Sequence, residues 1–157
     1  ADAGTEVHKG ISLYLQSAGG VPLGPRAYQG VCFLEDWRVA VLASEFVVWD
    51  QTTKVAGTID GIGRLPDGAL IVWDWKTGSG PWWEMALQLG AYAHLYEATV
   101  GAAPDRGFIV KLSDDSYSVF EVPDLAEAAG AYTTACQLHQ YGKDKWFQEV
   151  KAPSCNP

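Results

Sequence analysis

Hydrophobic and polar positions follow a helical period in some segments and a strand-like pattern in others, and the changes mark the predicted elements. Near the N-terminus, Val7, Ile11 and Leu15 recur at helical spacing behind Thr5, a predicted N-cap, and the Gly- and Pro-rich stretch that begins at Ala18 ends this helix. The further elements we expect are helix 26–38, strands 39–49, 55–64 and 69–77, helix 82–100, strands 106–112 and 117–122, and helix 124–141.

The strand at 69–77 is apolar on both of its faces, a pattern typical of a central strand covered on both sides. Trp73 and Trp75 are therefore predicted to lie in the core. The preceding Leu65-Pro66-Asp67-Gly68 is a turn, because Pro presets φ and Gly accepts a positive φ. The two strands around this turn should form a hairpin.

The order of the elements indicates an α/β fold with a mixed central sheet of about five strands flanked by helices. A length of 157 residues with 48% apolar residues suits one domain with a substantial core, so we expect a single domain over 1–157, with 151–157 as a loose tail. The first residue is Ala1 rather than Met, so the N-terminus could have been trimmed. No apolar run reaches the roughly 18 residues that cross a bilayer, so no membrane partner is expected.

The formal net charge of −8 excludes a surface that grips nucleic acid through positive charge everywhere. It leaves open a nucleic-acid enzyme whose acidic site is neutralised by metal. Cys32, Cys136 and Cys155 are too few and too scattered for a disulfide framework or a paired-cysteine metal site. Reduced thiols are the simplest interpretation, and they favour a cytoplasmic location, in a bacterium or a phage-infected cell.

Candidate chemistry gathers where the central strand ends. Asp74 and Lys76 are two apart and project from one face, and the hairpin brings Asp74 opposite about residues 58–60, beside Asp60. Two carboxylates on neighbouring strands repel each other unless a cation lies between them, and Mg²⁺ or Mn²⁺ binds through such oxygens. Glu45, in the first strand, is a third carboxylate that could reach the same place.

The helix at 82–100 carries a polar stripe with four-residue spacing, and its opposite side is apolar, with Met85, Leu89 and Ala93. The stripe consists of Glu84, Gln88, Tyr92 and Tyr96. Two interpretations stay open: the stripe faces solvent, or it covers the end of the sheet, binds phosphate oxygens and orients Lys76. At the start of this helix, Trp82 and Trp83 could stack on bases, but we favour a role in fastening the helix to the sheet. His94 and His139 are expected at the surface.

Five motifs in order resemble the PD-(D/E)XK nuclease superfamily, in particular its RecB-like exonuclease branch with phage and CRISPR-associated members. They are Gly4-Thr5-x-Val7-His8, Glu45, Ala56-Gly57-Thr58-Ile59-Asp60, Val72-x-Asp74-x-Lys76-Thr77-Gly78 and Gln88-x-x-x-Tyr92. The resemblance covers residues 4 to about 97.

The resemblance implies a metal site built by side chains and one backbone carbonyl. Asp60 and Asp74 would be the central metal ligands, joined by the carbonyl oxygen of Trp75 and by His8. One or two Mg²⁺ or Mn²⁺ ions would be bound. Some relatives hold an iron–sulfur cluster through four cysteines, but no such cofactor is expected here, because only Cys136 and Cys155 lie in the C-terminal region.

The same resemblance implies catalytic and substrate-binding roles for four further residues. Lys76 would orient the attacking water and stabilise developing charge, and Glu45 would be a catalytic acidic residue of the site. Gln88 and Tyr92 would support the site and contact DNA.

The expected function is that of a metal-dependent DNA exonuclease acting on single strands or duplex ends in DNA processing or recombination, with protein partners in a repair complex. One alternative is an inactive nuclease-like module that binds DNA or protein. A tryptophan-rich carbohydrate binder is another, but it gives no reason for the clustered carboxylates and lysine.

Overall fold

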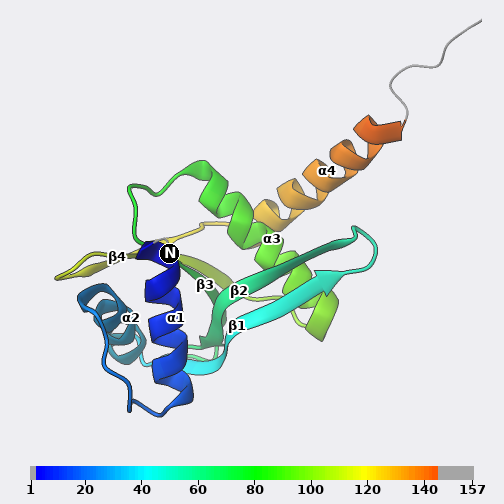
Figure 1. Ribbon diagram of the computed structural model, residues 1–157. Coiled ribbons are helices and arrows are strands. Elements are labelled where there is room, and N and C mark those ends of the chain that lie inside the picture. The colour runs from blue at the N-terminus through cyan, green and yellow to red at the C-terminus, as the bar shows by residue number, and fades with distance from the viewer. Residues whose placement is uncertain (1–2, 145–157) are drawn as a thin grey trace, which may run out of the picture.

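The computed structural model describes residues 3–144, and the side chains of residues 4–141 (Figure 1). The predicted tail at 151–157 and Cys155 lie outside the described residues. Among the helices of the described part, none is both long and apolar enough to span a bilayer.

The observed elements follow the predicted order. The helices are α1 (Ala3–Gln16), α2 (Pro25–Asp36), α3 (Trp83–Val100) and α4 (Leu125–Asp144). The strands are β1 (Ala40–Asp50), β2 (Val55–Arg64), β3 (Leu70–Lys76), β4 (Arg106–Leu112) and β5 (Tyr117–Glu121). Thr5 is not the N-cap that the sequence predicted, because α1 begins at Ala3 and Thr5 lies within its first turn. Gly101, with φ +83°, ends α3 in the left-handed conformation that favours glycine.

The five strands form one mixed sheet in the order β1-β2-β3-β4-β5, which confirms the predicted fold class. Only β3 and β4 pair in parallel, and α3 is the crossover that such a pair requires. Helices α1 and α2 cover one face of the sheet, and α3, with α4 packed against it, covers the other (Figure 1). The central strand β3 is thus buried on both faces, as its apolar sequence indicated.

Alternate residues of β3 belong to two separate cores. Trp73 and Trp75, both at most 2% exposed, pack with Phe33 of α2, and Val72 packs with Leu89 of α3. The Trp73 indole lies close against β2 at Gly61, where a Cβ atom would be 2.0 Å from the ring. Only glycine fits there, so this close approach fixes β2 against β3 immediately beside Asp60.

Candidate active site

The β2–β3 hairpin brings Asp60 and Asp74 to the same end of the sheet. Its register pairs Gly61 with Trp73, so the next positions outward are Asp60 and Asp74, as the turn geometry predicted. Both carboxyl groups are covered: Asp60 is 7% exposed and Asp74 is 1% exposed. Asp60 Oδ2 accepts a hydrogen bond of 2.8 Å from the backbone N–H of Trp75, which fixes the orientation of this carboxylate.

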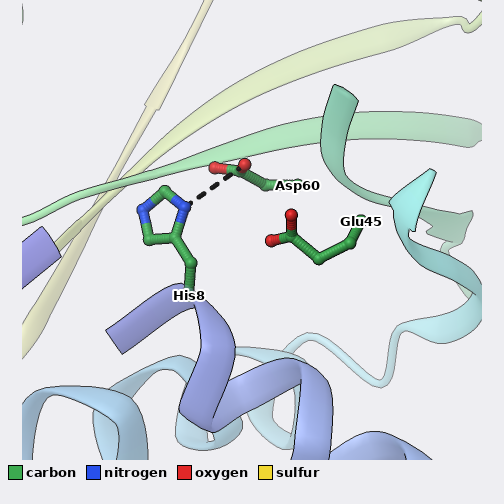
Figure 2. A group of neighbouring side chains, drawn as sticks. All are labelled: His8, Glu45 and Asp60. Atoms are coloured by element: carbon green, nitrogen blue, oxygen red, sulfur yellow. Dashed lines mark ion pairs between the residues drawn. The ribbon is translucent and has the colours of Figure 1, made fainter. Parts of the chain in front are cut away.

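His8 and Glu45 reach Asp60 from two other elements. His8 lies on α1, with Nδ1 3.3 Å from Asp60 Oδ1 and Nε2 3.1 Å from the carbonyl oxygen of Trp75. Glu45 lies on β1 between residues paired with Gly61 and Ile59 of β2, and its φ of +52° is rare for a residue other than glycine. Figure 2 shows the three side chains converging. One potential ligand atom from each lies within 4.8 Å of the others.

Asp74 turns instead to Lys76, whose Nζ lies 2.6 Å from Asp74 Oδ2. The described residues therefore divide the predicted site in two: His8, Glu45 and Asp60 form one cluster of potential metal ligands, and Asp74 with Lys76 forms an adjacent ion pair. The sequence predicted Asp60 and Asp74 as the central pair of ligands. The geometry adds that Glu45 is the carboxylate that shares the His8–Asp60 cluster in this structure.

Crowding of carboxylates contributes to the raised pKa values of Asp74, Glu45 and His8. Burial and the neighbouring Asp60 charge raise the pKa of Asp74 to about 6, although Lys76 opposes this change. Burial and the charge of Asp60 also raise the pKa of Glu45. The hydrogen bond with Asp60 raises the pKa of His8, against the effect of its own burial. Negative charge in the site is therefore in excess, and a bound cation would relieve it.

Helix α3 supplies a hydrogen-bonded chain that ends on the ion pair. Lys76 Nζ donates to Gln88 Oε1 at 3.1 Å, and Gln88 Nε2 donates to the Tyr92 hydroxyl at 2.8 Å. Burial and the charge of Asp74 raise the pKa of Tyr92 to about 12, so this phenol stays neutral. Of the two interpretations of the stripe, Gln88 and Tyr92 fit the one in which it covers the end of the sheet, whereas Glu84 is exposed.

A cleft of about 740 Å³ opens beside these groups. His8, Glu45 and Lys76 line it, and the loop after β3 contributes Thr77 and Gly78. The lining also includes a polar face of α1 that the sequence patterns did not single out. This face consists of Thr5, Lys9, Ser12 and Gln16, and its spacing of four, three and four residues was the signal that would have revealed it.

The donor set in this cleft fits a divalent cation. His8, Glu45 and Asp60 offer an imidazole nitrogen and two carboxylate oxygens within mutual reach, and the His8 ring already lies against the carbonyl of Trp75. Carboxylate and carbonyl oxygens suit Mg²⁺ and Mn²⁺, and an imidazole is also a common metal ligand. Residues from α1, β1, β2 and β3, far apart in the sequence, thus meet at one potential metal centre.

Comparison with known proteins agrees with this fold. The family model of the PD-(D/E)XK nuclease superfamily matches residues 3–153, and the chain therefore belongs to this superfamily. No curated protein matches the sequence.

Solved structures also resemble the chain. A protein from Eubacterium rectale named as a candidate exonuclease is similar over 98% of this chain and 77% of its own, at 10% identity and a TM-score of 0.54, a likeness of fold. The protein SSO0001 is similar over 92% of this chain and 74% of its own, at 18% identity and a TM-score of 0.43.

Proposed function

We propose that this nuclease-superfamily protein is a divalent-metal-dependent deoxyribonuclease that hydrolyses phosphodiester bonds in DNA, and that it acts as an exonuclease. One observation carries the proposal: the His8–Glu45–Asp60 cluster and the Asp74–Lys76 ion pair lie side by side at the edge of one open cleft. A structural ion pair alone would not need three further ionisable groups beside it. A site that binds an anionic substrate and a cation would need such additional ionisable groups.

The residues proposed to hold Mg²⁺ or Mn²⁺ are His8, Glu45 and Asp60, with the Trp75 carbonyl and with Asp74 as the further carboxylate. One or two ions are compatible with this number of ligands. A cation held there would supply positive charge to the scissile phosphate and make water more acidic.

Lys76 is proposed to act on the phosphate or on the attacking water. Its ammonium is held between Asp74 and Gln88, so its position is set before substrate arrives. A donor with a fixed position stabilises the charge that develops in the transition state without reorganising at that moment. Gln88 and Tyr92 keep Lys76 in place, and both are proposed to contact DNA as well.

Exonuclease action is the finer part of the proposal. The similarity in fold to the candidate exonuclease from Eubacterium rectale supports it, as does the resemblance of the motifs to the RecB-like branch. A role in DNA processing or recombination, in company with other proteins, belongs to the same proposal.

End-labelled linear DNA and covalently closed circular DNA, each incubated with Mg²⁺, Mn²⁺ or EDTA, test the proposal. We expect the linear substrates to be degraded from their ends in the presence of a divalent cation, and the circle to persist. Asp74→Ala should abolish cleavage, whereas Glu35→Gln, an exposed acidic position on α2, should leave it unchanged. Cleavage of the circle would indicate an endonuclease, and no cleavage of any substrate would favour an inactive binding module.

A further inference from the structure

Two adjacent tryptophans at the start of α3 are exposed to solvent. Trp82 is 58% exposed and Trp83 is 74% exposed, whereas Trp73 and Trp75 of β3 are almost fully buried. The expected role of Trp82 and Trp83 in fastening α3 to the sheet fits these exposures poorly, because side chains so open contribute little to packing. Large exposed indoles on the segment that follows a cleft-lining loop are more typical of a binding surface.

Trp82 is hydrogen-bonded to the loop that borders the cleft, and Trp83 is the next residue in the chain. Thr77 and Gly78 line the cleft, and the indole Nε1 of Trp82 donates a hydrogen bond of 3.0 Å to the carbonyl of Ser79, the next residue of the same loop. Gly80 has a φ of +142°, and a Cβ atom there would lie 3.2 Å from the Trp82 ring. A glycine thus lets the loop fold closely against the indole. In Figure 1 this loop leads from the end of β3 to the first turn of α3, beside the N-terminal end of α1.

The charge of this protein favours only weak electrostatic binding to a nucleic acid. The net charge is −8, and the lysines and arginines among the described residues that line the cleft are Lys9 and Lys76. Elsewhere in the described chain, two arginines are neutralised by ion pairs, Arg26 with Asp114 and Arg106 with Glu121. Binding through phosphate contacts is therefore expected to be weak. Stacking of bases on aromatic rings does not depend on net charge.

We propose that Trp82 and Trp83 form a base-stacking platform that binds unpaired bases of the nucleic-acid strand whose phosphate lies in the cleft. This inference rests on the proposed nuclease function and assigns a substrate preference to the same site. The faces of paired bases are covered by their neighbours in a duplex, so only an unpaired strand or a frayed end offers them to the indoles. The platform therefore makes the protein select single-stranded substrate next to the scissile bond.

Fluorescence anisotropy in EDTA, where no cleavage is expected, tests the platform. The probes are a labelled oligothymidylate and an abasic strand of the same length, which carries the phosphates without the bases. We expect the wild type to prefer oligothymidylate, and the double variant Trp82→Ala with Trp83→Ala to bind it about 5- to 100-fold more weakly. Binding of the abasic strand should not change.

Two control variants separate stacking from a general loss of structure. Trp49→Ala removes another exposed indole, 49% exposed and located on β1, and should leave binding unchanged. Phenylalanine at both positions keeps an aromatic face and should retain most of the preference. All variants should show the melting temperature of the wild type, because the replaced rings are exposed.

Equal binding of the two probes by the wild type, or an unchanged preference in the double variant, would overturn the inference. Cleavage is measured separately with Mn²⁺. If no DNA is cut but oligothymidylate binding still depends on Trp82 and Trp83, the proposed nuclease function fails while the platform stands. If DNA is cut but the double variant binds oligothymidylate as the wild type does, the proposed nuclease function stands and the platform fails.

Discussion

The backbone N–H of Trp75 donates a hydrogen bond of 2.8 Å to Asp60 Oδ2, and the two residues are 15 positions apart in the chain. The other oxygen of the same carboxylate, Oδ1, faces His8 at 3.3 Å. Asp60 thus both holds β2 to β3 and belongs to the proposed metal centre. Oδ2 contributes to the fold and Oδ1 to the proposed metal centre, and substitutions of Asp60 can distinguish the two roles.

Replacing Asp60 by alanine should affect both stability and metal binding, whereas Asp60→Asn should affect mainly metal binding. The asparagine oxygen can still accept the Trp75 N–H, but alanine leaves this buried donor without a partner, at a loss of about 1–3 kcal/mol in the free energy of unfolding. Urea denaturation without metal measures the first effect, and the rise in melting temperature with Mn²⁺ measures the second. Equal stability of the two variants would contradict the structural role of Oδ2.

Metal binding should weaken as the pH falls. The hydrogen bond to Asp60 raises the pKa of His8, and the imidazole must lose its proton before it can bind a cation. Above this raised pKa, protons do not compete with the cation for the His8 imidazole. Below it, each unit of pH should lower the Mn²⁺ affinity about tenfold for one released proton. Asp74, with a pKa raised to about 6, acts in the same direction.

Titration calorimetry at pH 8 and pH 6 measures this dependence, and buffers of different ionisation enthalpy count the protons released. His8→Ala should weaken binding at pH 8 and flatten the pH dependence, with the part that remains coming from the carboxylates. A slope unchanged by His8→Ala would exclude His8 as the titrating ligand.

Gln88→Ala should slow cleavage by about tenfold without unfolding the protein. Gln88 accepts from Lys76 and donates to Tyr92, so its loss frees the ammonium from one of its two partners. Lys76→Ala should reduce the rate further, by about 10²- to 10³-fold, because it removes the charged donor itself. Glu84→Ala is the matched control, since it lies one turn earlier on the same stripe and is exposed. Rates under single-turnover conditions measure these effects, and a slow Glu84→Ala variant would point to a general effect on α3.

Local signals in the sequence predicted most of the fold. The Pro66–Gly68 turn set the hairpin register, and the two-sided apolar pattern of β3 predicted its central position. The alignment of Asp60 with Asp74 followed from that register. Such features depend on neighbours in sequence or on a short turn, and their physical cause can be read from residue types.

What the sequence did not reveal depends on contacts between distant elements. Glu45 was expected near the other carboxylates, but the positive φ in β1 with which it joins the His8–Asp60 cluster is announced by no residue type. The exposure of Trp82 and Trp83 was also missed, because an indole next to a helix start is equally compatible with packing and with binding.

His94 was predicted as an ordinary surface residue, but it is half-buried and lies 3.0 Å from Asp50 Oδ2. Asp50 ends β1, and it also accepts hydrogen bonds from the backbone N–H groups of Thr52 and Thr53. The His94 ring in turn contacts Tyr132 of α4, with ring centroids 5.7 Å apart. This cluster therefore joins the β1–β2 turn to α3 and α4, on residues separate from the proposed metal ligands.

Asp50→Ala should lower the free energy of unfolding by about 1–3 kcal/mol at pH 7, since it removes several hydrogen bonds to one charged acceptor. The bonds from His94, Thr52 and Thr53 hold the pKa of Asp50 well below its usual range. The stabilisation is thus complete above the unfolded-state pKa of about 3.9 and is lost as the pH falls below it. Urea denaturation of the wild type and of the variant at pH 7 and near pH 3 measures the difference, which should shrink at the lower pH. Glu35→Ala, at an exposed position, is the control and should show no comparable loss at pH 7. Equal destabilisation by Asp50→Ala at both pH values would show that the carboxylate charge is not what stabilises the β1–β2 turn.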